Sequence, residues 1–208
     1  MSYNTAAKTP ANTTTKTRMM VQIAMITAVA VVLRLFDFSL PFSSSFYKID
    51  LSEVPILIGC FAMGPAAGII IEAMKILLNF IISGTVTAGV GELANFAIGC
   101  SMVLPAGLIY RYHKTRKNAV LGMAAGTLVM AAIGGLLNAF VLLPAYAALF
   151  GGMDAIIGMG TAVNKNITSV QSFVLLSVVP FNLVKGVIVS LVTFLLYKHV
   201  SRVLIHNA

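Results

Sequence analysis

The sequence predicts an all-α integral membrane protein: a compact bundle of six transmembrane helices with cytoplasmic N and C termini. Of its 208 residues, 59% are hydrophobic and only 10% are charged. A water-soluble domain carries about 25% charged residues, so most of this surface must face an apolar medium. The apolar residues form continuous runs, whereas barrel strands would alternate, and this favours helices.

Six apolar runs are predicted as the helices of the bundle. They occupy residues 19–36, 53–63, 66–83, 90–110, 119–149 and 170–197. A full membrane span needs about 20 residues, so the second run is short. It ends at Gly64-Pro65, because proline cannot continue a helix well. If this run were re-entrant, the chain would cross five times and its termini would lie on opposite sides.

The basic residues predict the orientation. Nine of them lie in three stretches that contain no acidic residue: before the first apolar run, between the fourth and fifth runs, and after the last. They are Lys8, Lys16, Arg18, Arg111, Lys114, Arg116, Lys117, Lys198 and Arg202. Since cytoplasmic loops are rich in Lys and Arg, both termini and the 111–118 loop should be cytoplasmic, which favours six crossings. Residues 37–52, 84–89 and 150–169 would then be outer loops. The same placement explains the net charge of +8 without nucleic acid as a partner.

One membrane domain with two short tails is expected. Residues 1–17 have the composition of a disordered cytoplasmic tail, residues 18–200 form the six-helix substrate-binding domain, and residues 201–208 form a cytoplasmic C-terminal tail. The third outer loop, 150–169, contains four glycines and shows no evident secondary structure. It has the length of a lid or of a plain connector.

Polar residues form a stripe on four of the predicted helices. They are Glu72, Lys75, Asn79, Glu92, Asn95, Asn138, Asn182 and Lys185. Those on one helix are three, four or seven residues apart and share a face. Because polar groups in hydrocarbon are costly, one polar pocket open to the outside would explain them. The structural alternatives are pairing of Glu72 with Lys75 and hydrogen bonds between helices by the asparagines.

Lys185 has no acidic residue within a helical turn, so its three donors need another partner. With Asn182 it offers directional donors and acceptors, which suit a flat heterocycle with an imide-like edge. Arg34 is the only arginine outside the basic flanks, and this favours an uncharged ligand over a phosphorylated one. Aromatic faces for such a ring could come from Phe46, Tyr47, Phe173 and Phe181.

The sequence contains no catalytic or ATP-binding motif. All three histidines lie in cytoplasmic flanks, and Cys60 and Cys100 stand alone without metal-ligand spacing. The chain is therefore predicted not to be an enzyme, with neither a metal nor a catalytic cofactor. Uptake against a gradient would need an external motor. A membrane enzyme using Glu72 and Glu92, or a small proton-driven secondary carrier, are the alternatives.

Five motifs together resemble one known family. They read Ile49-Asp50-Leu-Ser-Glu53-Val-Pro55, Gly64-Pro65-Ala-Ala-Gly68, Glu72-Ala-Met-Lys75-Ile-Leu-Leu-Asn79, Asn95-Phe-Ala-Ile-Gly99 and Pro180-Phe-Asn182-Leu-Val-Lys185-Gly186. Over residues 19–200 the chain resembles the riboflavin-specific S components of energy-coupling-factor (ECF) vitamin transporters. An S component for another vitamin or for flavin mononucleotide is the alternative within this resemblance.

The resemblance implies a subunit of the bacterial cell membrane that captures riboflavin from outside. It would deliver riboflavin inward by docking on a transmembrane coupling (T) subunit driven by two cytoplasmic ABC-type ATPases. The implied ligand contacts are Asn138, Asn182, Lys185, Phe46, Tyr47, Lys48, Asn79 and Asn95. The implied docking surface is Ala24 and Ala28, whose spacing lets another helix approach closely, unless it serves internal packing.

Overall fold

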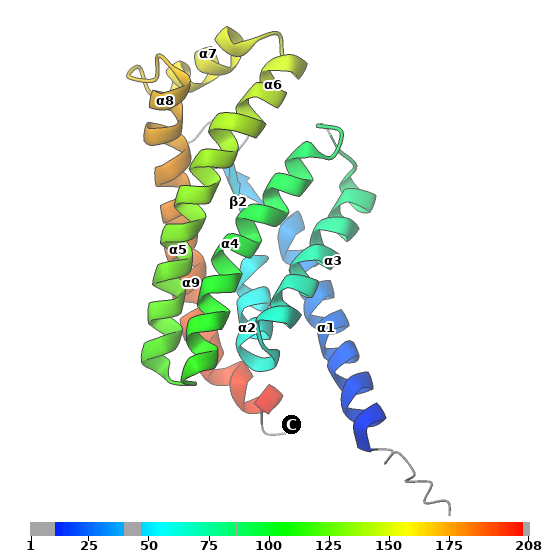
Figure 1. Cartoon of the computed structure of the whole chain (residues 1–208). Coiled ribbons are helices and arrows are strands. Elements are labelled where there is room, and N and C mark those ends of the chain that lie inside the picture. The colour runs from blue at the N-terminus through cyan, green and yellow to red at the C-terminus, as the bar shows by residue number, and fades with distance from the viewer. Residues whose placement is uncertain (1–10, 40–46, 86, 206–208) are drawn as a thin grey trace, which may run out of the picture.

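The computed structural model describes the backbone of residues 11–39, 47–85 and 87–205, and the side chains of those between 16 and 197. Most of this part is helical (Figure 1). The α-helices are α1 (Ala11–Leu35), α2 (Glu53–Met63), α3 (Pro65–Ser83), α4 (Val90–Tyr112), α5 (Arg116–Leu137), α6 (Leu143–Leu149), α7 (Met153–Val163), α8 (Val170–Phe173) and α9 (Val179–Ile205). Two π-helical turns, η1 (Asn138–Leu142) and η2 (Val174–Val178), continue α5 into α6 and α8 into α9.

Five helices of the described chain are long and apolar enough to cross a membrane. They are Lys16–Leu35, Pro65–Ser83, Val90–Tyr112, Arg116–Leu149 and Val170–Tyr197. Their outward faces expose large apolar side chains such as Leu93, Leu128 and Leu195. Such a surface suits a lipid environment and confirms the prediction of a multi-helix membrane fold.

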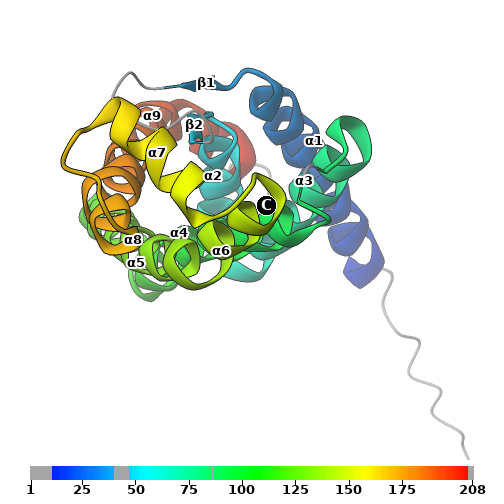
Figure 2. The same cartoon turned by 90° about the horizontal axis from the view of Figure 1, so that it is seen from above.

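The short helix α2 lies in the middle of the bundle, as the view from above shows (Figure 2). It packs against α1, α3, α4 and α9, and every residue from Glu53 to Phe61 is buried. Because its neighbours surround it, α2 does not need the length of a helix that faces lipid. Gly64, at a φ of 101° that L-residues rarely adopt, separates α2 from α3 at the predicted break.

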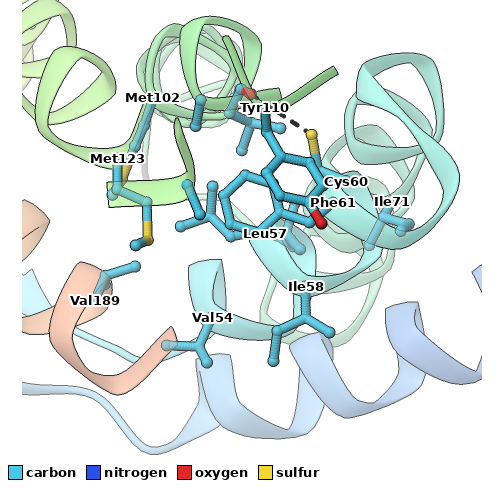
Figure 3. Close-up of a cluster of buried hydrophobic side chains, with 14 of the residues drawn as sticks. Val54, Leu57, Ile58, Cys60, Phe61, Ile71, Met102, Tyr110, Met123 and Val189 are labelled. Carbon is cyan, nitrogen blue, oxygen red and sulfur yellow. Dashed lines mark hydrogen bonds between the residues drawn. The ribbon is translucent and has the colours of Figure 1, made fainter. Parts of the chain in front are cut away.

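The core around α2 is apolar (Figure 3). Leu57 and Phe61 belong to one buried cluster with Met102 of α4 and Met123 of α5, and the ring of Phe61 lies 4.7 Å from that of Tyr110. The thiol of Cys60 donates a hydrogen bond to the carbonyl of Val103, at 3.6 Å. This cysteine is therefore a packed core residue, as its isolated position in the sequence suggests.

The first and last helices extend into both predicted tails. Helix α1 begins at Ala11, so residues 11–17 are helical rather than disordered, and α9 continues to Ile205, into the tail predicted for 201–208. Adding residues to an existing helix costs little compared with nucleating one, so the membrane helices extend into their polar flanks. The start of α1 and the end of α9 lie at the same end of the bundle (Figure 1).

Two of the segments predicted as outer loops contain structure that the sequence pattern did not predict. Helix α7 lies within 150–169, where Ile156 and Gly160 are buried and Asp154 occupies the first turn. In the segment predicted as the first outer loop, β1 (Phe38–Ser39) pairs antiparallel with β2 (Lys48–Ile49). The glycines of α7 interrupt its amphipathic pattern, so the helix was not predicted. Strands of two residues are too short to show the alternation of polar and apolar residues by which strands are predicted.

Candidate functional site

A cavity opens at the end of the bundle where β2 lies, opposite the α4–α5 connection (Figure 1). It contains about 680 Å³ of empty space, including the space at its open mouth. Six of the eight predicted ligand contacts line it: Tyr47, Lys48, Asn95, Asn138, Asn182 and Lys185. The structure thus brings residues of the β2 segment, α4, η1 and α9 to one polar cavity. Their contact with a ligand stays a prediction.

The two asparagines are held in place by their own helices. Nδ2 of Asn138 donates to the carbonyl of Gly134, at 2.7 Å, and Nδ2 of Asn182 donates to the carbonyl of Val178, at 2.9 Å. Oδ1 of Asn138 accepts a hydrogen bond from Tyr47, whereas Oδ1 of Asn182 accepts none from the described residues. Asn182 can therefore offer the cavity an acceptor in a fixed orientation.

Both asparagines are associated with π-helical turns. Asn138 is the first residue of η1, and Val178, which accepts the hydrogen bond from Asn182, is the last residue of η2. A π turn adds a residue to a helical turn and shifts the following side chains around the axis. Such turns often occur at functional sites, but a search for regular helical spacing cannot reveal them.

Tyr47, the residue before β2, contacts Asn138 and two phenylalanine rings. Its hydroxyl donates to Oδ1 of Asn138 at 2.6 Å, and its ring lies 5.3 Å from that of Phe181 and 6.3 Å from that of Phe173. Burial, together with Tyr146, raises the pKa of Tyr47 well above its usual value, so the phenol stays neutral. Phe181 lines the cavity, but Phe173 is fully buried behind it, and Phe46 lies outside the described residues.

Lys185 has no acidic residue within a helical turn, but a carboxylate distant in sequence lies beside it. Its ammonium lies 3.3 Å from Oδ2 of Asp50, a residue 135 positions earlier, and Nη1 of Arg34 lies 2.7 Å from the same oxygen. Burial alone would raise the pKa of Asp50, but Lys185, Arg34 and Lys75 and a hydrogen bond from Ser52 hold it well below its ordinary value. Asp50 therefore stays ionised. The spacing rule missed it because it considers only contacts within one helix.

Glu72 and Lys75 form a structural ion pair. Nζ of Lys75 lies 2.9 Å from Oε1 of Glu72 and 2.9 Å from Oε1 of Glu53, and all three side chains are at most 5% exposed. Glu92 instead accepts hydrogen bonds from Thr85, at 3.0 Å, and from Thr87, at 3.4 Å, before α4. These contacts do not assemble Glu72 and Glu92 into an acid–base pair.

Asn79 lies away from the cavity, whereas Lys48 lines it. Asn79 is partly exposed, lies outside the cavity lining and accepts a hydrogen bond from Ser83 at 3.4 Å. The end of α3 that carries it leans away from α9 (Figure 1), so the polar face of α3 does not reach the cavity at this depth. Lys48 lines the cavity, but its ammonium pairs with Asp37, at 3.0 Å. Among the described residues, no group of three His, Cys, Asp or Glu could hold a metal ion.

The chain is similar to known proteins in both sequence and structure. The model of the family described as "ECF transporter, substrate-specific component" matches residues 18–197. The riboflavin transporter RibU of Staphylococcus aureus (strain TCH60) is 34% identical over 185 residues, which cover 89% of this chain and 91% of that protein. The riboflavin transporter FmnP of Bacillus subtilis (strain 168) is 31% identical over 183 residues, which cover 88% and 91%. A solved S component of a bacterial ECF transporter superposes with a TM-score of 0.72 at 34% identity, covering 91% of this chain and 98% of that one.

Proposed function

Because this chain belongs to the substrate-specific (S) components of ECF transporters, we propose that it captures riboflavin at the outer face of a bacterial cell membrane. The observation that carries the proposal is the pair of Asn182 and Lys185 at one cavity. The isoalloxazine ring of riboflavin has an edge on which an N–H lies between two carbonyl groups. The free Oδ1 of Asn182 suits the N–H, and the ammonium of Lys185 suits a carbonyl.

The membrane arrangement of the proposal has six helices, with α2 as the short one and both termini cytoplasmic. Lys16 and Arg18 at the start of α1, with the basic α4–α5 connection, lie at the end of the bundle opposite β2 (Figure 1). Cytoplasmic loops collect such residues, and the cavity would then open to the outside.

The partners in this proposal are a T subunit and two ABC-type ATPases, since the sequence has no ATP-binding motif of its own. Ala24 and Ala28 on α1 are both exposed. By contrast, Gly122 and Gly126, which have the same spacing, are buried against the backbone of α4. The Ala24/Ala28 face of α1 is thus exposed and could contact another helix, whereas the Gly122/Gly126 face of α5 already packs against α4.

Riboflavin titration of the purified protein tests the ligand. We expect saturable quenching of flavin fluorescence, because a bound isoalloxazine ring would stack on aromatic side chains such as Phe181. The same titration with flavin mononucleotide tests the phosphorylated alternative. A folded protein that leaves the fluorescence of both flavins unchanged would favour an S component for another vitamin.

Bulky residues on α1 should separate docking from binding. In the variant with Ala24→Leu and Ala28→Leu, we expect riboflavin uptake by cells with the complete transporter to be abolished while riboflavin binding by the purified protein is kept. The added side chains would keep a partner helix away from α1. Ala124→Leu, at an exposed position of α5 on another side of the bundle, is the control and should leave uptake unchanged. Loss of riboflavin binding in the double variant would mean that Ala24 and Ala28 serve packing within the protein.

A further inference from the structure

We infer that Asp50 is a positioning residue of the ligand site, which holds Lys185 and Arg34 at the cavity without lining it. The inference rests on the proposed function, because it concerns the binding of riboflavin. Lys185 and Arg34 both belong to the cavity lining, whereas Asp50 does not and is 1% exposed. Any effect of Asp50 on the ligand therefore acts through these two cations.

The carboxylate of Asp50 is fixed from both sides. Oδ2 accepts from Nη1 of Arg34, at 2.7 Å, and from Nζ of Lys185, at 3.3 Å. Oδ1 accepts from the backbone N–H of Ser52, at 2.9 Å, and from the Ser52 hydroxyl. A carboxylate with four donors at its two oxygens has little freedom to move, so it holds the two cations in place. Three segments distant in sequence meet here: the last turn of α1, the loop after β2, and α9.

The ionisable side chains around Asp50 form two groups. Arg34 and Lys185 share the carboxylate of Asp50, and Glu53 and Glu72 share the ammonium of Lys75. A second, smaller polar cavity lies between the groups, lined among others by Asp50, Glu53, Lys75 and Lys185. Each group thus pairs its buried ionisable side chains locally.

This balance decides what kind of ligand the cations can serve. Because Lys185 pairs directly with Asp50, its ammonium does not need an anionic ligand as a partner. The ammonium has three donors, and the hydrogen bond to Asp50 uses one of them. The others are available for an uncharged carbonyl group, as in riboflavin. Without Asp50, Lys185 and Arg34 would repel each other, and the ammonium would leave this position.

A double-mutant cycle between Asp50 and Lys185 tests the inference. Riboflavin affinity is measured by fluorescence titration for the wild type, Asp50→Asn, Lys185→Met and the double variant. We expect Asp50→Asn to weaken binding by about tenfold or more, the usual loss for a charged hydrogen bond. In the Lys185→Met background, the same substitution should weaken binding by a clearly smaller factor, because only Arg34 is then left for Asp50 to hold. If Asp50 only stabilised the loop, it would weaken binding by the same factor in both backgrounds, and this would overturn the inference.

Asp50→Glu keeps the test decisive if Asp50→Asn does not fold. It retains the charge but moves the carboxylate by one methylene, so it should also weaken binding more when Lys185 is present than in the Lys185→Met background. Asp154→Asn, at an exposed carboxylate on α7, is the control and should leave affinity unchanged. A wild-type protein that binds no riboflavin would overturn the proposed function together with this inference. Wild-type binding with equal losses in the two backgrounds would overturn only the role of Asp50.

Discussion

Lys185→Ala should weaken riboflavin binding by at least about 1.5 kcal/mol, the usual contribution of a charge-assisted hydrogen bond. The substitution removes the ammonium that lies at the cavity and faces Asp50 at 3.3 Å. It should leave the helices in place, because Asp50 keeps its contacts with Arg34 and Ser52. Binding is measured by fluorescence titration, and folding is checked by thermal unfolding in the same detergent.

Lys165→Ala is the matched control for this prediction. Lys165 is an exposed lysine after α7 and does not line the cavity, so its removal should not change riboflavin affinity. An unchanged affinity in Lys185→Ala, with wild-type affinity in the control, would remove Lys185 from the ligand site. It would also leave Asn182 as the principal directional group of α9.

Most of the helices could be predicted because membrane spans depend on a local property, the length of an apolar run. The runs 53–63 and 66–83 agree with α2 and α3 to within one residue, and the break at Gly64-Pro65 is confirmed. Helix α7 escaped prediction because its apolar face covers only a few residues between glycines. The position of α2 inside the bundle depends on contacts with four other helices, which no local pattern contains.

Part of the candidate site could be predicted, because polar side chains of a membrane helix cannot face lipid. This argument brought Asn95, Asn138, Asn182 and Lys185 to one cavity. It did not identify Asp50, because Asp50 lies in a loop. Carboxylates in loops are usually solvated, so the sequence gives no sign that this one is buried. Nor could it exclude Asn79, since the position of that residue depends on how α3 leans away from its neighbours.

Lys75→Met should destabilise the protein by about 3–5 kcal/mol, the usual loss when one partner of a buried ion pair is removed. Lys75 is the ammonium that Glu53 and Glu72 share at 2.9 Å, and its side chain is 3% exposed. Without it, two carboxylates would lie close together in the membrane interior with no cation bound directly between them. The free energy of unfolding, measured by denaturant titration in mixed micelles, should fall accordingly.

Glu72→Gln distinguishes the cost of an unpaired charge from the cost of altered packing at the same place. It nearly preserves the shape of the side chain, and it leaves Lys75 paired with Glu53 as a neutral couple. Apart from the contact of Oε1 with Lys75, the oxygens of Glu72 have no hydrogen-bond partner among the described residues, so the glutamine replaces few specific contacts. We therefore expect a much smaller loss of stability than in Lys75→Met, with the exposed Lys165→Met unchanged. Equal losses in Glu72→Gln and Lys75→Met would show that packing, rather than charge pairing, stabilises this part of the bundle.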